Sequence, residues 1–252
     1  MKKIQLTLVQ IDNYGPWTVT PKPRKEAELQ SLQADLFSEL EKEFSARKGL
    51  IFPTRFDNMI ATTNGITVQE HRKIQQAINE KFPVTVSIGI GAAPTPYEAQ
   101  VIATLALQHA GGSRSAERSG VLAGAGVKAP DEDWVQITHM DMNHSALITD
   151  SEPIYDTHII LQRVHLSLMR SLLGRKALVF YTGGDNFMAP SNGLDVNEFT
   201  KVFSEVKCEL GVELKAGIGA APTAEQAARL ASEGLHEIRE GKSKPPIVFK
   251  RA

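Results

Sequence analysis

The fold is decided by the stretch Tyr181–Gly193, which reads YTGGDNFMAPSNG, and by the apolar run Ala177–Phe180 (ALVF) before it. A buried strand, two glycines and a second apolar run predict a tight strand-turn-strand with Asp185 at its tip. A glycine pair also lets a flat ligand or a phosphate approach the backbone closely. The hairpin around Asp185 is therefore the first candidate for a functional site.

The same hairpin occurs in the first half of the chain, over Gly49–Gly65. The differences 185 − 57 and 193 − 65 both give an offset of 128. Eight residues of the first copy are identical to their partners at this offset: Leu50, Phe52, Thr54, Asp57, Asn58, Ala61, Asn64 and Gly65. The chain is therefore a duplication.

Each half begins with a predicted strand that ends at a carboxylate. Ile4–Ile11 runs into Asp12, and Trp134–Met140 runs into Asp141. The difference 141 − 12 is 129, so we pair these two carboxylates and allow one residue gained or lost before the hairpin. An amphipathic helix, the hairpin, a shorter helix, a strand and another helix follow in both halves.

This order predicts an α+β fold of two tandem ferredoxin-like βαββαβ domains, each with a helical layer on one face of its sheet. The expected division is a first domain over 1–110, a Gly, Ala and Ser-rich linker over 111–133, and a second domain over 134–252. The repeated motif GIG, at Gly89–Gly91 and Gly217–Gly219, lacks the last glycine of a dinucleotide-binding fingerprint. We interpret it as a turn that allows close packing.

Composition excludes several classes of function. The chain has 252 residues and a formal net charge of −1, and no long basic run, so a duplex nucleic acid is not an expected partner. No stretch approaches the roughly 18 apolar residues of a membrane span, and no signal peptide is evident, so we expect a soluble, cytoplasmic protein without a membrane partner. Cys208 is the single cysteine, which excludes an internal disulfide and a zinc site that needs two thiolates.

The four carboxylates of the two halves predict metal sites. In such a sheet the first strand and the hairpin are neighbours, so we expect Asp12 near Asp57 and Asp141 near Asp185. Mg²⁺ is typically held by one or two carboxylates together with substrate phosphates. The loop after each first strand offers backbone N–H groups and an Asn side chain, Asn13 or Asn143, to those phosphates.

The competing interpretation is structural, since Asp and Asn are common in turns and a duplication preserves core residues as readily as site residues. His139 and His144 flank Asp141 and are candidates for proton transfer. We expect the other five histidines to be surface residues or satisfied helix residues.

Four motifs resemble a known family. They are Val9–Thr18 (VQIDNYGPWT), Arg55–Asn58 (RFDN), Gly183–Phe187 (GGDNF) and Lys215–Gly219 (KAGIG). The pairing of an Asp after the first strand with a Gly-Gly-Asp hairpin resembles the palm domains of nucleotidyl cyclases, and the longer motifs resemble archaeal GTP cyclohydrolase III over nearly the whole chain.

The resemblance implies an enzyme that opens the imidazole ring of GTP at C8, retains the formyl group and releases the two outer phosphates. The implied product is 2-amino-5-formylamino-6-ribosylaminopyrimidinone 5′-monophosphate, a precursor in riboflavin and deazaflavin biosynthesis. It implies Mg²⁺ as cofactor and K⁺ as activator, and a homo-oligomer is expected. The residues expected to bind substrate are Asn13, Tyr14, Arg55, Asn58, Asn143, Gly183, Gly184 and Asn186.

Two other functions stay open at this point, a nucleotidyl cyclase and a nucleotide-binding module without turnover. Against a diguanylate cyclase, the hairpin has Asn186 where that class has a second acidic residue. The base that activates water is open among His139, His144 and a water held by the metal.

The two hairpin tips have diverged, with Arg55-Phe56 in the first half and Gly183-Gly184 in the second. Arg55 offers phosphate a fixed cation but blocks the close backbone approach that the glycines permit. We therefore expect the halves to be unequal and to bind one GTP per chain.

Overall fold

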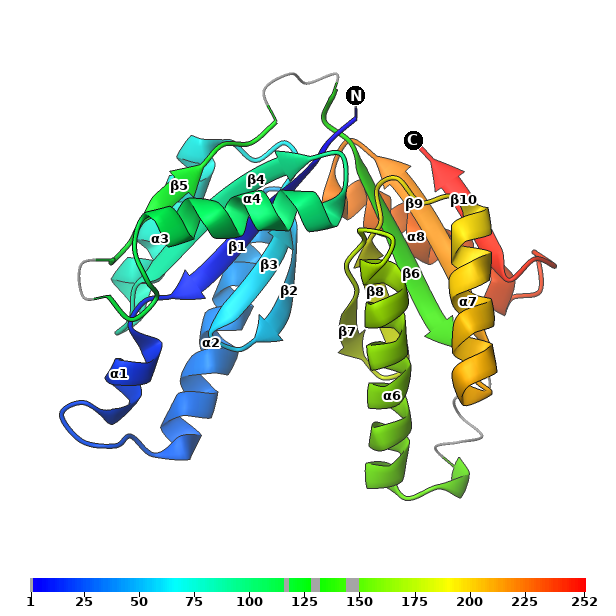
Figure 1. Cartoon of the computed structure of the whole chain (residues 1–252), viewed down its shortest axis with the longest axis horizontal. Coiled ribbons are helices and arrows are strands. Elements are labelled where there is room, and N and C mark those ends of the chain that lie inside the picture. The colour runs from blue at the N-terminus through cyan, green and yellow to red at the C-terminus, as the bar shows by residue number, and fades with distance from the viewer. Residues whose placement is uncertain (1, 116–117, 128–131, 144–149) are drawn as a thin grey trace. The chain divides into compact units, whose positions relative to one another are not determined.

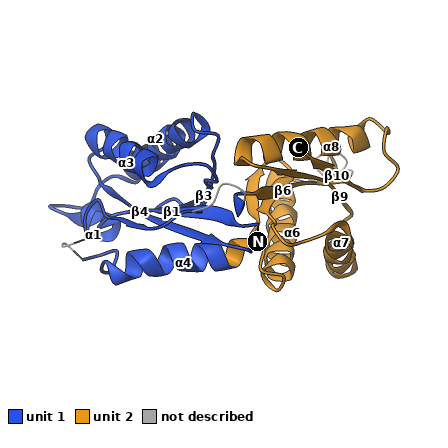
Figure 2. Cartoon of the chain, turned by 90° about the horizontal axis from the view of Figure 1, so that it is seen from above, with its two compact units in different colours: residues 1–94, 98–133 blue, residues 95–97, 134–252 orange. Residues whose placement is uncertain are grey.

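The structure is a computed structural model that describes residues 2–115, 118–127, 132–143 and 150–252. The chain divides into two compact units (Figure 2). Unit 1 comprises Met1–Pro94 and Glu98–Asp133, and unit 2 comprises Thr95–Tyr97 and Trp134–Ala252.

Unit 1 is built on a five-stranded sheet in the order β2-β3-β1-β4-β5 (Figure 1). Its strands are β1 (Ile4–Ile11), β2 (Leu50–Arg55), β3 (Asn58–Thr62), β4 (Val86–Ala93) and β5 (Leu122–Gly124). Its helices are α1 (Tyr14–Val19), α2 (Glu26–Ser45), α3 (Val68–Lys81) and α4 (Pro96–His109).

Unit 2 repeats this plan in a sheet of order β10-β9-β6-β8-β7. Its strands are β6 (Val135–Met142), β7 (Phe180–Gly183), β8 (Asn186–Pro190), β9 (Leu214–Ala221) and β10 (Ile247–Arg251). Its helices are α6 (Ile154–Leu173), α7 (Val196–Leu210) and α8 (Ala224–Arg239). The duplicated α+β fold predicted from the sequence is confirmed.

Two features of the fold differ from the prediction. Helices cover both faces of each sheet, with α2 and α3 opposite α4, and α6 and α7 opposite α8 (Figure 2). The expected linker also supplies a strand, because β5 pairs in parallel with β4 as β10 pairs with β9. A three-residue strand flanked by Gly and Ser carries too little periodicity to be seen in the sequence.

The GIG motifs lie within β4 and β9, not in turns. A Cβ on Gly89 would lie 2.3 Å from the Ala103 carbonyl oxygen, and one on Gly217 would lie 1.8 Å from that of Ala231. Real Cβ atoms do not approach so closely, so these glycines let α4 and α8 lie directly on the sheet. The predicted close packing is confirmed. It sets the position of α4 and α8 on the sheet faces where the candidate sites lie.

Local signals explain several helix ends. Thr67 and Glu70 form a capping box at the start of α3, and the Thr223 side chain accepts from the Gln226 N–H at the start of α8. Gly211, with φ of 71°, ends α7 in the left-handed conformation that suits glycine.

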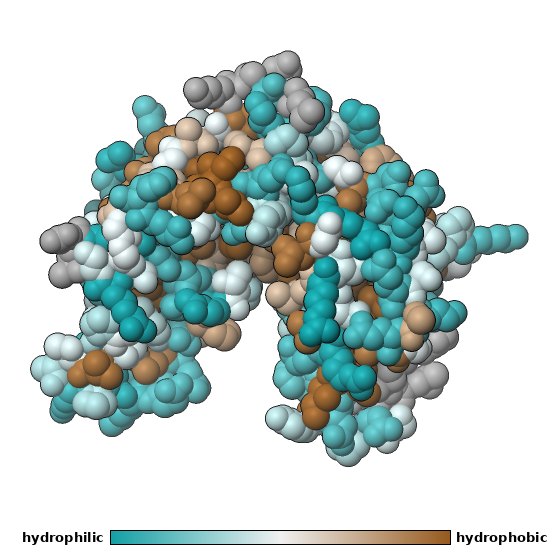
Figure 3. Space-filling view, viewed as in Figure 1, coloured by the Kyte–Doolittle hydropathy of each residue, from teal (hydrophilic) through white to brown (hydrophobic). Residues whose placement is uncertain are grey.

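Two helices leave large apolar side chains exposed. On α4, where Figure 3 shows apolar surface, Ile102 and Leu105 are 44% and 45% exposed. On α6, five partly exposed side chains recur at spacings of three, four or seven residues: Tyr155, Ile159, Leu166, Met169 and Leu173.

The strand register corrects the pairing of the two halves. Gln10 lies opposite Asn58 in the first sheet, whereas Asp141 lies opposite Asn186 in the second. Asn58 and Asn186 are equivalent hairpin residues, so the position of Asp141 is filled by Gln10 in the first half. The offset for this strand is therefore 141 − 10, or 131, and not 129.

Two glutamines at the start of the same strands, Gln5 and Gln136, agree with this register. Gln5 Nε2 donates to the carbonyl oxygens of Thr63 and Ile66 at 2.8 and 2.9 Å. Gln136 Nε2 donates to those of Ser191 and Leu194 at 2.9 and 2.8 Å. Since 136 − 5 is also 131, Asp12 is equivalent to Asn143 and not to Asp141.

Candidate active site

The second half brings two of the predicted carboxylates together. Asp141 is near the end of β6, and Asp185 is in the turn between β7 and β8. Burial raises the pKa of Asp141, but interactions with Asp185, Arg239 and Lys215 outweigh it and lower the pKa below its ordinary value. Asp185 therefore lies close to Asp141, as the sequence predicts.

One oxygen of Asp141 is fully used and the other is not. Oδ2 accepts from Arg239 Nη2 at 2.7 Å and Nε at 2.8 Å, and Lys215 Nζ lies 3.1 Å away. Oδ1 is buried and has no hydrogen-bond donor among the described residues. A buried carboxylate oxygen without a donor is costly, and a hard cation that binds oxygen would satisfy it. The residues present therefore fit Mg²⁺.

His139 lies two residues before Asp141, on the same face of β6. It contacts the hairpin residue Asn186. Its Nε2 lies 3.1 Å from Asn186 Oδ1 and its Nδ1 lies 3.1 Å from Ser232 Oγ. Since Asn186 Oδ1 also accepts from Arg239 Nη2 at 3.2 Å, Nε2 carries the ring proton and Nδ1 accepts from Ser232.

Burial lowers the pKa of His139, and the opposing effects of Asn186, Asp141 and Asp185 do not reverse this. The ring is therefore neutral near pH 7, with both nitrogens engaged. His139 lies where the sequence predicts, and it also holds Asn186 in place beside the carboxylates. His144, the other predicted proton-transfer residue, lies outside the described residues.

The hairpin tip of the second half is open. Gly183 and Gly184 have φ of 104° and 58°, which other residues rarely adopt. A Cβ on Gly183 would meet no atom of the described structure within 4 Å. The backbone at this tip therefore has room for a ligand next to Asp185.

The first half does not reproduce this site. Asp12 Oδ1 accepts from Ser87 Oγ at 2.6 Å, and Oδ2 accepts from Thr85 Oγ1 at 2.9 Å and the Gly120 N–H at 2.8 Å. These bonds tie the segment after α4 to the sheet. Asp57 instead pairs with Arg55, whose Nη2 is 3.1 Å from Oδ2. The expectation of four carboxylates at matched positions is wrong, because Gln10 stands where the second half has Asp141.

The other predicted substrate-binding residues are distributed over both halves. Asn13 has φ of 51° and donates through Nδ2 to the Ser115 carbonyl at 3.1 Å, and Tyr14 accepts from Gln33 Nε2 at 2.7 Å. Asn58 accepts from Gln10 Nε2 at 2.7 Å. Asn143 lines a separate cavity of about 290 Å³ beside Phe203. Asn13, Tyr14 and Asn58 each have a structural partner. The substrate-binding role of these residues and of Asn143 stays a prediction.

Sequence reasoning missed three polar residues of the second-half site, Lys215, Ser232 and Arg239. Lys215 is in a motif that repeats at the offset of 128, and its counterpart in the first half is Ser87. This difference between the halves is the signal in the sequence that could have identified Lys215 as a site residue. Arg239 replaces Gly111 of the first half, at the end of α8.

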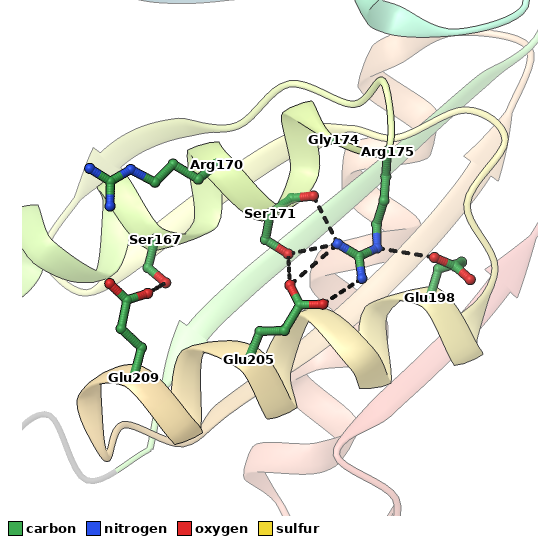
Figure 4. A pocket seen from close by; sticks show the side chains of 8 residues that line it. All are labelled: Ser167, Arg170, Ser171, Gly174, Arg175, Glu198, Glu205 and Glu209. Atoms are coloured by element: carbon green, nitrogen blue, oxygen red, sulfur yellow. Dashed lines mark hydrogen bonds and ion pairs between the residues drawn. The ribbon is translucent and has the colours of Figure 1, made fainter.

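A second surface cavity of unit 2 is not part of this site. It has a volume of about 610 Å³ and is lined by α6, α7 and the residues that follow α6 (Figure 4). Arg175 donates to Glu198 at 3.0 Å and to Glu205 at 2.6 Å, and Ser167 donates to Glu209 at 2.6 Å (Figure 4). These groups satisfy one another across the two helices, so the cluster is a structural link.

Within the ranges that the structure describes, no three His, Cys, Asp or Glu side chains form a group that could hold a metal. A pair of carboxylates supplemented by substrate phosphates remains compatible with Mg²⁺. Over the same ranges, no helix has the length and apolar character needed to cross a membrane.

Comparisons with known proteins agree with the resemblance seen in the sequence. A family model described as GTP cyclohydrolase III matches residues 4–251. A GTP cyclohydrolase III of Methanothermobacter thermautotrophicus is 54% identical over 239 residues, which cover 94% of this chain and 95% of that protein. The one of Methanocaldococcus jannaschii is 49% identical, covering 94% and 88%.

Among solved structures, the GGEEF domain of a diguanylate cyclase from Vibrio cholerae matches 48% of this chain and 85% of its own. It is 12% identical, with a TM-score of 0.38.

Proposed function

The chain belongs to the GTP cyclohydrolase III family, and from this premise we propose that it opens the imidazole ring of GTP by adding water at C8. The formyl group stays on the product, 2-amino-5-formylamino-6-ribosylaminopyrimidinone 5′-monophosphate. The two outer phosphates leave as inorganic phosphate. GTP is thus the proposed substrate partner of the chain.

The carboxylates of the second half, Asp141 and Asp185, would hold Mg²⁺. The observation that carries this assignment is Asp141 Oδ1, which is buried and has no hydrogen-bond donor among the described residues, in a side chain close to Asp185. When bound, Mg²⁺ would stabilise the negative charge that builds on the phosphoryl oxygens as water attacks phosphorus. K⁺ as an activator is a proposal that rests on the family alone.

The chain's own groups would orient the triphosphate. Lys215 and Arg239 present cations beside Asp141, and the open backbone of Gly183 and Gly184 lies next to Asp185. A guanidinium and an ammonium at this position stabilise phosphate oxygens through charge-assisted hydrogen bonds. On substrate binding, Arg239 would exchange a carboxylate oxygen for a phosphate oxygen.

His139 would position Asn186 and hold a neutral imidazole near the reacting groups. Its Nδ1 accepts from the Ser232 hydroxyl, so proton movement at this ring requires that hydroxyl to rotate away. His139→Gln keeps a donor for Asn186 but cannot take up a proton, and a flattened pH profile of kcat in this variant would identify proton transfer.

Incubation with GTP and Mg²⁺ tests the function. We expect loss of the purine absorption band, release of two phosphates per GTP, and loss of both with EDTA or in Asp141→Asn. Release of pyrophosphate would instead identify a nucleotidyl cyclase. An unchanged spectrum with bound GTP would identify a nucleotide-binding module without turnover. Either result would overturn the proposal.

A homo-oligomer would cover the exposed side of α6. The five apolar side chains from Tyr155 to Leu173 follow the heptad-like spacing of a helix pair. In an antiparallel pair of copies, Asp156 near the start of one helix comes opposite Arg170 near the end of the other. Leu166→Glu should lower the mass measured by light scattering, and Ile102→Glu on α4 is the control that should not. An unchanged mass in Leu166→Glu would contradict this interface.

A further inference from the structure

We propose that the first half has its own ligand site, a cavity on the α4 face of its sheet that binds a phosphoryl group. The cavity has a volume of about 540 Å³, within the size range of small-molecule sites. It lies between strands β1 to β3, the end of α4 and the segment that follows α4. The lining residues used below are Leu8, Gln10, Arg55, Asn58, Leu107 and Arg118.

Two buried donors of this cavity have no acceptor. Asn58 Nδ2 and Arg118 Nε are both buried, and neither has a hydrogen-bond partner in the part of the chain that the structure describes. Buried polar groups in folded proteins are almost always paired, because an unpaired one loses its hydration without compensation. Two such donors in the lining of one cavity therefore indicate a ligand that supplies acceptors.

Several contacts hold the Arg118 side chain in place beside the cavity. Its side chain is 2% exposed, Nη1 donates to the Gly111 carbonyl at 3.3 Å, and Nη2 donates to Gln10 Oε1. Nε is 3.6 Å from Asp12 Oδ1, which is an ion pair but not a hydrogen bond. Asp12 is satisfied by Ser87, Thr85 and Gly120, and its ion pair helps to hold the Arg118 guanidinium in place.

The charge of the walls favours an anion. The described residues that line the cavity include two arginines and no carboxylate. The Arg55 side chain is 73% exposed and its one ion pair among the described residues is with Asp57, so it can turn to a ligand. Guanidinium groups bind phosphate oxygens through paired, charge-assisted hydrogen bonds. Leu8 and Leu107 add apolar wall, so the volume accommodates more than phosphate alone.

On the equivalent face of the second half, different residues stand at the positions that line this cavity. At an offset of 131, His139 replaces Leu8 and Asp141 replaces Gln10, and at 128 Gly183 replaces Arg55. Arg239, equivalent to Gly111, there donates to Asp141 and Asn186. The first-half cavity is thus distinct from the proposed metal site, and it requires no metal.

Orthophosphate and GMP are the probes, titrated by calorimetry into the full chain with EDTA present to exclude metal-dependent binding. We expect saturable binding that weakens at least about tenfold in Arg55→Gln and in Arg118→Gln, the loss of one charge-assisted hydrogen bond. Arg229→Gln, on the exposed side of α8, is the matched control and should bind as wild type. Asp141→Asn should also leave binding unchanged, which separates this site from the proposed function.

The two probes distinguish free phosphate from a nucleotide. Equal affinities would identify a phosphate site, and tighter binding of GMP that is lost in Arg55→Gln would identify a nucleotide site. Both results support a phosphoryl ligand. Arg55 is exposed, so its variant remains informative if Arg118→Gln fails to fold. Absence of binding at millimolar probe, or binding that neither variant weakens, would overturn the proposal.

Discussion

The two halves of the chain share one scaffold and differ in the chemistry of one face. In the second half, β6 and its hairpin present Asp141 and Asp185, with Arg239 and Lys215 as counter-charges. In the first half, β1 and its hairpin present Gln10 and the pair Arg55–Asp57, with Arg118 behind them. One half thus presents acceptors that fit a cation, and the other presents donors that fit an anion.

The difference shows how few positions decide a site. The contacts of Gln5 and Gln136 are the same in the two halves, as is the close approach of α4 and α8 to their glycines. Exchange of Gln10 for Asp141 places a carboxylate where the first half has an amide, without altering the strand register. Function in such a duplicated fold is therefore set by the site and not by the architecture.

The largest expected effect is a difference in activity between variants of the two hairpin carboxylates, Asp185 and Asp57. Asp185→Asn should lower kcat for GTP by about 100-fold or more, because it removes a charge that we propose holds Mg²⁺ beside the phosphates. Asp57→Asn, at the equivalent turn position, should change kcat by less than about threefold, an effect below 1 kcal/mol. Steady-state kinetics at saturating Mg²⁺ measures both. Comparable losses in the two variants would show that the halves act alike.

The next effect is on stability and compares the backbone conformations of the two hairpin turns. Gly183→Ala places a side chain at φ of 104° and should lower the free energy of unfolding by about 1–3 kcal/mol. Arg55→Ala, at the equivalent position and largely exposed, should change it by no more than about 0.5 kcal/mol. Urea unfolding followed by circular dichroism tests this. A stable Gly183→Ala variant would show that the turn relaxes to another conformation.

The smallest effect uses a buried position that differs between the halves. His71 is fully buried in unit 1, and its equivalent in unit 2 is the buried Phe199. His71 Nδ1 donates to the Thr67 carbonyl and Nε2 accepts from Thr7 Oγ1, each at 2.8 Å. Burial lowers the pKa of His71, and the raising effects of Thr67 and Glu70 do not overcome it, while Arg47 lowers it further.

The neutral ring is thus favoured in the folded state, while the unfolded chain takes up a proton below about pH 6.5. This stabilising contribution is complete above that pH and is lost as the pH falls below it, by at most about 1.4 kcal/mol per pH unit. His71→Phe should reduce the difference between urea midpoints at pH 7.5 and 5.5. An unchanged difference would show that His71 does not titrate in this range.

The sequence predicted the duplication, the hairpins and the facing pair Asp141 and Asp185, because identical turn residues at a fixed offset report a repeated backbone. It did not give the register of the first strands. Matching carboxylate to carboxylate suggested 129, whereas Ile4–Thr7 (IQLT) against Val135–Thr138 (VQIT) supports 131. The glutamines Gln5 and Gln136 were the better guide, because hydrogen bonds between a strand and its neighbouring segments constrain register more strongly than an exposed turn does.

The partners of the site could not be predicted. Arg239 and Lys215 reach Asp141 from α8 and β9, about 100 and 70 residues away, and their role depends on how these elements pack. Arg118 likewise reaches Gln10 from a segment whose composition predicts only a linker. Contacts between elements distant in sequence carry no local signal.

The most direct test of the central claim counts bound metal in each half. Mn²⁺ is titrated into the wild type and four Asp→Asn variants with a non-hydrolysable GTP analogue, and free Mn²⁺ is measured by electron paramagnetic resonance. We expect Asp141→Asn and Asp185→Asn to lose the Mn²⁺ that the wild type binds, and Asp12→Asn and Asp57→Asn to retain it. Loss of Mn²⁺ in the first-half variants with retention in the second-half variants would contradict the assignment of the metal to Asp141 and Asp185.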